Sequence, residues 1–88
     1  MVYNVFLSPQ AEEQYADLPE HVQHLVDVAM EDMEINPFRK AKKLKNCSIA
    51  DWRRHVARTH RILFNVQGED VKIVAILPKT NRTIGFQS

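Results

Sequence analysis

The clearest pattern of apolar positions lies between residues 19 and 35. Apolar residues recur there at the spacing of one helical face, at Val22, Leu25, Val26, Ala29 and Met33. Five acidic residues lie among the remaining positions of this segment. Pro19 suits a helix start, and Asn36-Pro37 ends the pattern. The segment therefore predicts an amphipathic helix with an acidic outer face.

A shorter helix is predicted just before it. Ser8 belongs to the residue types that cap a helix by accepting backbone N–H groups, and Pro9 fits the first helical position, where no N–H donor is needed. This helix should end near Leu18. The seven residues ahead of Ser8 are rich in β-formers and predict a first strand.

The second half of the chain predicts strands at residues 51–57, 60–66 and 71–77. In the middle segment Ile62 and Phe64 alternate with Arg61 and Leu63, which indicates two different faces. The third segment is almost wholly apolar, as is typical of a central strand covered on both faces. Residues 83–86 predict a short last strand.

These elements predict a single α+β domain over residues 1–88. Its expected order is β-α-α-β-β-β: an N-terminal strand, a two-helix hairpin, and an antiparallel sheet of three to four strands against which the helices pack. The longest apolar run, at residues 73–77, is far shorter than the ~20 residues that span a bilayer, and no secretion signal is evident. The single cysteine, Cys47, excludes an internal disulfide and fits a reducing cytoplasm.

Charge is divided unevenly along the chain. Residues 1–38 hold eight acids and no Lys or Arg, whereas residues 39–88 hold twelve Lys or Arg against three acids. The total of +1 therefore hides a strongly polar molecule. This division indicates a basic surface that binds an anionic partner.

The candidate functional residues are concentrated in the predicted strands and just after them: Arg53, Arg54, His55, Arg58, His60, Arg61, Lys79 and Arg82. Alternation along a strand places Arg53 and His55 on one face, and Arg61 should also point away from the helix-covered core. Arginine offers paired donors matched to phosphate, and histidine can move a proton near neutral pH. The alternative is a solvated sheet face whose charges maintain solubility.

Other features are less specific. The run at residues 39–45 carries five charges in seven positions and suits contact with a phosphate backbone or a solvated loop equally well. His21 and His24 have no third or fourth partner for a metal, so no metal site and no cofactor is expected. Cys47 is interpreted as a loop or partly buried thiol, and Trp52 as a packing anchor.

The chain resembles the RelE/ParE toxin superfamily almost from end to end. The first shared motifs are Leu7-Ser8-Pro9-Gln10-Ala11, Leu18-Pro19-Glu20, Asn36-Pro37 and Lys43-Leu44-Lys45. The most specific are Asp51-Trp52-Arg53-Arg54-His55-Val56 followed by Thr59-His60-Arg61-Ile62-Leu63-Phe64. An apolar segment at residues 71–77, a basic segment and an aromatic residue at Phe86 complete the order.

The resemblance implies a toxin of a toxin–antitoxin pair. In the RelE branch the toxin cuts mRNA on the ribosome without a metal, because basic side chains stabilise the charge that develops as a ribose 2′-OH attacks the neighbouring phosphate. Carried over by position, the implied catalytic residues are His55 as general base, with Arg53, Arg61 and Arg82. The implied RNA-binding residues are Lys43, Lys45, Arg54, Arg58 and Lys79.

Two alternatives stay open at this stage. The ParE branch inhibits DNA gyrase without chemistry of its own, and Phe86 and the acidic helices favour such a protein-binding role. The third possibility is an inactive homologue that only binds an antitoxin. All three imply a cytoplasmic complex with a small cognate antitoxin.

Overall fold

The computed structural model describes residues 2–79. Its elements are β1 (Asn4–Leu7), α1 (Pro9–Ala16), α2 (Glu20–Ile35), β2 (Lys42–Lys43), β3 (Trp52–Val56), β4 (His60–Gln67) and β5 (Asp70–Pro78). The two helices and the three long strands confirm the predicted α+β order. The strand predicted at residues 83–86 lies outside the described residues.

The five strands form one mixed sheet in the order β1-β5-β4-β3-β2. The pairs β3–β4 and β4–β5 are antiparallel, as the sequence predicts. The antiparallel pair β2–β3 was not predicted, because the sequence indicated only a basic connector at residues 39–45. β1 adds a parallel pair, because it runs beside β5 with Val5 opposite Val71. Parallel neighbours need a long crossover between them. The whole of the intervening chain supplies it, so β5 becomes an interior strand between β1 and β4.

α1 begins at the predicted cap and covers the part of the β5 edge that β1 leaves unpaired. Ser8 Oγ accepts the Ala11 N–H at 3.1 Å and donates to the Val74 carbonyl at 2.9 Å. Gln14 Oε1 accepts the Ile76 N–H at 2.7 Å. Because β1 pairs with β5 only as far as Ile73, these side chains satisfy backbone groups that no strand reaches.

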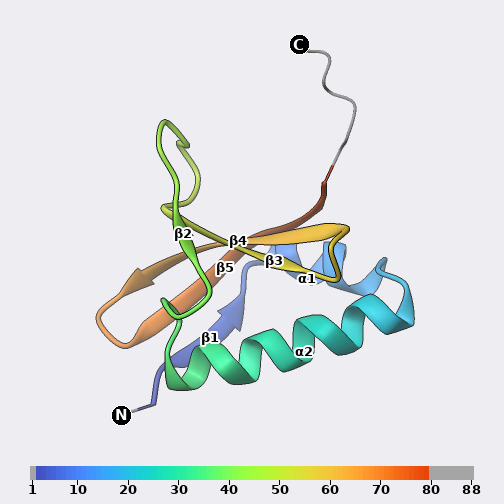
Figure 1. Cartoon of the computed structure of the whole chain (residues 1–88), viewed down its shortest axis with the longest axis horizontal. Helices are drawn as coiled ribbons and strands as arrows, with labels where there is room; N and C mark the ends of the chain where they lie inside the picture. The colour runs from blue at the N-terminus through green and yellow to red at the C-terminus, as the bar shows by residue number, and fades with distance from the viewer. Residues whose placement is uncertain (1, 80–88) are drawn as a thin grey trace.

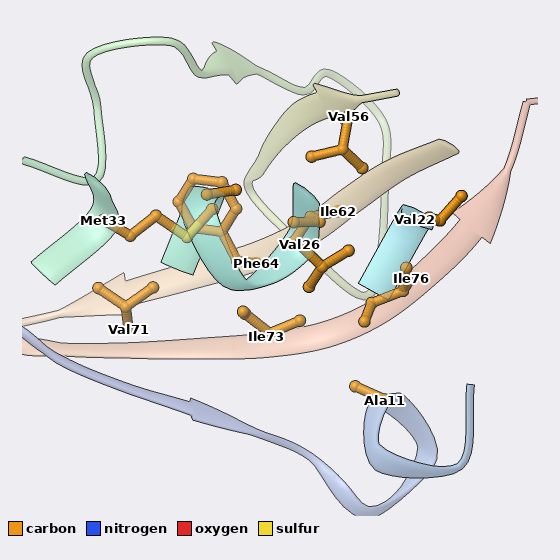
Figure 2. Close-up of a cluster of buried hydrophobic side chains, with 11 residues drawn as sticks. Ala11, Val22, Val26, Met33, Val56, Ile62, Phe64, Val71, Ile73 and Ile76 are labelled. Carbon is orange, nitrogen blue, oxygen red and sulfur yellow. The ribbon is translucent and has the colours of Figure 1, made fainter. Parts of the chain in front are cut away.

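α2 lies across one face of the sheet (Figure 1). Four of the five predicted stripe residues, Val22, Val26, Ala29 and Met33, are buried, and Leu25 remains 39% exposed. The stripe packs against inward-facing residues of the strands, including Phe64 and Ile73 (Figure 2). The core of the protein therefore lies between α2 and the sheet.

A second, smaller apolar cluster consists of Ala50, Leu63 and Ala75, with Leu44, Val74 and Leu77 partly buried around it. Leu63 lies between two residues of the main core along β4, so it points to the other face of the sheet. The register of β4 and β5 shifts at Leu63/Phe64. Leu44 anchors the connector between β2 and β3, which extends beyond the sheet on the side away from α2 (Figure 1).

Neither described helix is long and apolar enough to span a membrane.

Candidate functional site

Three candidate residues meet on the sheet face opposite α2. Arg53 and His55 alternate with the buried residues Arg54 and Val56 along β3, which gives them a common direction. An Arg53 guanidinium nitrogen contacts His55 Nε2. His55 lies directly opposite Arg61 of β4. The structure thus brings together Arg53, His55 and Arg61.

The contact between Arg53 and His55 defines the state of the imidazole. A guanidinium only donates hydrogen bonds, so Nε2 of His55 accepts and the ring proton belongs on Nδ1. Partial burial of the ring lowers the pKa of His55 below its ordinary value, and positive charge lowers it further, from Lys79, Arg53, Arg61 and Lys42. His55 is therefore a neutral base among cations at neutral pH.

Arg61 has an unsatisfied donor. Its Nε is buried and has no hydrogen-bond partner among the described residues. A buried donor without an acceptor typically costs about 1–3 kcal/mol. An anion bound on this face would supply the missing acceptor, and an arginine beside a neutral histidine suits a phosphate group.

A pocket of about 330 Å³ opens beside these residues, lined by Lys40, Lys42, Arg53 and His55. Lys42 lies opposite Arg53 in the ladder between β2 and β3. All four lining residues are cationic or able to become so, and none is Phe, Tyr or Trp. The pocket therefore favours an anion over an apolar ligand.

Arg54 does not belong to this group. It is 8% exposed and faces α2, where it forms an ion pair of 3.0 Å with Asp32. The hydrogen bond from Arg54 is the main reason that the pKa of Asp32 lies below its ordinary value. The structure thus places Arg54 in the contact between helix and sheet, away from the surface that Arg53 and His55 share.

Lys43 also points away from the pocket. It lies opposite Trp52, and its Nζ is 5.2 Å from the centre of the indole ring. Trp52 in turn packs beside Phe38, with ring centres 5.0 Å apart, and against the main core. These contacts agree with the interpretation of Trp52 as a packing anchor.

The remaining predicted residues lie around the site. Lys45 is exposed in the connector, and Arg58 is exposed in the turn between β3 and β4. Lys79 follows β5, donates its backbone N–H to the Thr59 carbonyl at 2.7 Å, and is near enough to His55 to act on its pKa. Arg82 and Phe86 lie outside the described residues.

The structure singles out Lys40 and Lys42, which the sequence analysis included only as part of the run at residues 39–45. The sequence of this run does not indicate which lysines share a face, because the strand has only two residues and both are lysines. Lys42 is recognised as part of the site only through its pairing with Arg53, and no local sequence pattern predicts that pairing. His21 and His24 are exposed on α2, and no three metal-ligating side chains gather within residues 2–79.

The turn between β3 and β4 has an unusual backbone. Ala57 and Arg58 have φ of 56° and 60°, values that glycine or asparagine adopts more readily. Both residues follow directly after the strand that carries Arg53 and His55. The turn fixes the register that brings His55 opposite Arg61.

Solved structures share this fold along nearly the whole chain. The toxin–antitoxin complex RelBE2 from Mycobacterium tuberculosis gives a TM-score of 0.79 at 20% identity, covering 90% of this chain and 100% of that one. The archaeal RelE–RelB complex from Pyrococcus horikoshii gives 0.78 at 19% identity, covering 92% and 99%. The YoeB dimer from Staphylococcus aureus gives 0.73 at 21% identity, covering 91% and 100%.

No family model matches the chain, and no curated protein matches its sequence. The likeness therefore lies in the arrangement of the helices and the sheet, at identities of about one residue in five. The agreement covers both helices and the sheet that carries the basic site. The chain has the fold of the RelE/ParE toxin superfamily.

Proposed function

We propose that this chain is the toxin of a toxin–antitoxin pair and cleaves mRNA on the ribosome without a metal. The observation that carries the proposal is the group formed by Arg53, His55 and Arg61, in which a neutral imidazole lies between two guanidinium groups. Such a group holds a phosphate and removes a proton beside it, which are the two requirements of cleavage by a ribose 2′-OH.

In the proposed reaction the 2′-oxygen attacks the neighbouring phosphorus while His55 takes its proton. Arg53 first exchanges its contact with His55 Nε2 for a phosphate oxygen, which frees that nitrogen to accept. The bond from phosphorus to the 5′-oxygen then breaks, and the leaving oxygen takes a proton from water. The products are a 2′,3′-cyclic phosphate and a 5′-hydroxyl end.

Arg61 stabilises the charge that grows on the phosphate oxygens in this reaction. Its buried Nε has no other acceptor among residues 2–79, so the side chain loses no hydrogen bond from Nε when it turns toward the phosphate. Arg82 is proposed as a further cation at the same phosphate. Lys45, Arg58 and Lys79 are proposed to bind flanking phosphates, whereas Arg54 and Lys43 already have partners within the protein.

The proposed partners are a cognate antitoxin, the ribosome and mRNA, which places the protein in the cytoplasm. Two of the similar structures are described as toxin–antitoxin complexes, which supports an antitoxin as the first of these partners. Among residues 2–79, no acid forms an ion pair with His55 or Arg61 on the basic face. An acidic antitoxin segment would neutralise that face and block the phosphate site.

The test is to express the chain alone and map mRNA ends in growing cells. We expect cuts that carry 2′,3′-cyclic phosphates, and we expect Arg61→Ala to abolish them. Lys72→Ala is the matched control, because Lys72 is an exposed cation of β5 whose neighbours in the sheet are Phe6 and Asn65 and not the residues of the site. Intact mRNA with wild-type protein would overturn the proposal.

A second candidate is a gyrase inhibitor, and the observation that favours it is the exposed acidic surface of α2, with Glu20, Asp27, Glu31 and Glu34. These acids suit contact with a protein better than contact with RNA. The same cells distinguish the two functions. Trapped gyrase–DNA breaks with intact mRNA would indicate the inhibitor, and normal growth would indicate a homologue that only binds an antitoxin.

A further inference from the structure

We propose that Lys40 and Lys42 form a second phosphate subsite, which binds the RNA phosphate adjacent to the one that reacts. The inference rests on the proposed function, since it assigns a neighbouring phosphate to the same RNA strand. Neither lysine belongs to the group that performs the proposed reaction. Their role is to bind and align the strand.

The first argument is the position of the cations on the sheet. His55 and Arg61 lie opposite each other on β3 and β4, and Lys42 and Arg53 lie opposite each other on β2 and β3. Adjacent strands are spaced by about 4.8 Å. The cations therefore extend across three neighbouring strands, and a polyanion that crosses the strands meets them in succession.

The second argument is that this arrangement lacks internal compensation. Lys42 opposite Arg53 is a pair of like charges at directly facing positions, which destabilises a sheet. Within residues 2–79 the only ion pair joins Arg54 to Asp32, on the other face. Lys40 also acts on the pKa of Asp32, but that carboxylate already accepts a hydrogen bond from Arg54. A bound phosphate would relieve the repulsion.

The third argument is the character of the pocket between the two pairs. Its volume of about 330 Å³ lies at the lower end of the usual range for ligand sites, about 300–1,000 Å³. Such a space holds a nucleotide unit rather than a lone ion. Its lining of Lys40, Lys42, Arg53 and His55 is rich in groups that bind phosphate and contains no Phe, Tyr or Trp ring. The subsite therefore reads the backbone and contributes affinity without base preference.

The chemistry of lysine agrees with this role. A lysine ammonium is a compact charge on a flexible stem, which tolerates different phosphate positions, whereas arginine holds one oxyanion in a fixed geometry. The two arginines lie beside His55, where the reaction requires fixed geometry. Lys42 lies on the neighbouring strand β2 and Lys40 in the turn before it, where the RNA only needs to be held.

The test compares two RNA probes that cannot be cleaved, a 2′-O-methyl dinucleotide with one phosphate and a trinucleotide with two. Binding is measured by calorimetry over a range of salt concentrations. For the wild-type protein we expect the second phosphate to increase affinity about tenfold and to steepen the salt dependence by about 0.7, the slope per phosphate for single strands. In the double variant Lys40→Ala/Lys42→Ala both gains should disappear.

The control is Arg39→Ala/Lys72→Ala, which removes the same amount of charge from two exposed positions outside the pocket and should keep the gain from the second phosphate. Urea unfolding verifies that both double variants are folded. The inference is overturned if the wild type gains nothing from the second phosphate, if the Lys40/Lys42 variant keeps the gain, or if the control loses it equally.

The same experiment separates this inference from the proposed function. Cleavage of cellular mRNA tests the chemistry of His55 and Arg61, whereas the uncleavable probes test binding alone. A gain that depends on Lys40 and Lys42 in a protein that cuts no mRNA would preserve the subsite and overturn the nuclease. In a protein that does cut mRNA, Lys40→Ala/Lys42→Ala should raise KM about tenfold and leave kcat within a factor of two.

Discussion

The two faces of β3 carry the same kind of residue in opposite circumstances. Arg54 points toward α2, is buried, and has an acidic partner in Asp32. Arg53 and His55 point to the other face, where they meet Arg61 and Lys42 and no acid of the described chain pairs with them. The acidic residues of α2 therefore stabilise one side of the strand only, and the other side keeps its positive charge for a ligand.

This difference explains how a chain of nearly neutral total charge can bind an anion. The acids of α2 lie in the helical layer, and the cations of β2, β3 and β4 lie in the sheet (Figure 1). The sheet and the main core between them separate the two groups of charges. A ligand on the basic face consequently interacts first with the cations beside it.

The largest expected effect is on the open face. His55→Ala should lower the rate of RNA cleavage by about 10²–10⁴-fold, the usual contribution of a general base. The stability of this variant to urea should be close to that of the wild type, because the His55 side chain is exposed. Single-turnover cleavage at saturating RNA measures the effect. An equal loss in Arg54→Ala at a temperature where both variants are folded would contradict the division between the faces.

Two neighbours on β4 test the packing beneath each face. Phe64 is fully buried in the main core, whereas Leu63 is 7% exposed in the small cluster on the open side. We expect Phe64→Ala to lower the free energy of unfolding by about 3–5 kcal/mol. Leu63→Ala should lower it by about 2–3 kcal/mol, since its surroundings can relax toward solvent. Urea titration of both variants gives the comparison, and reversed values would place the main core on the wrong face.

Substitutions of Arg54 and Arg53 compare the helix-side face of β3 with its open face. Arg54→Ala should lower the free energy of unfolding by about 1–3 kcal/mol, because it removes a buried stem and a charge-assisted hydrogen bond. Arg53→Ala should leave stability unchanged or raise it, since it removes a cation that faces Lys42. Thermal unfolding measures both, and a greater loss in Arg53→Ala would refute the assignment.

The pH dependence of His55 sharpens the comparison further. Its folded pKa lies below the ordinary 6.5, so the unfolded chain binds the proton more readily between these two values. Stability should therefore fall as pH drops from 6.5 toward the folded pKa, and His55→Gln should remove that contribution. Cleavage should rise with pH up to the folded pKa and then level off. NMR titration should show the pKa of His55 increasing in Lys79→Ala, and no change there would exclude Lys79 as a cause.

The smallest effect is expected at the turn that joins the two functional strands. Ala57 and Arg58 both have positive φ, so Ala57→Asn/Arg58→Gly should raise the free energy of unfolding by about 0.5–1 kcal/mol. Thr59→Gly is the control and should lower it, because Thr59 is not among the residues with positive φ. Thermal unfolding distinguishes the two outcomes.

The sequence allowed the local elements to be predicted because their signals are local. The stripe from Val22 to Met33, the cap at Ser8 and the alternation around Ile62 each depend on neighbours along the chain. The parallel pairing of β1 with β5 was not predicted, since no local pattern specifies a partner so distant. The register between neighbouring strands likewise determines which residues meet in the site. Arg53, His55 and Arg61 follow from alternation, but the burial of Arg54 requires Asp32 to be opposite, and the role of Lys42 requires β2 to pair with β3.

The pairing of β1 with β5 has a consequence for synthesis. Asn4 and Asp70 are hydrogen bonded across 66 residues of chain, and β5 lies between β1 and β4 in the sheet. A ribosome adds about 5–20 residues per second. For the seconds before β5 emerges, the N-terminal strand and both helices lack the surface on which they fold, and contacts this distant in sequence slow folding further. The basic site is therefore assembled only after β5 has been synthesised.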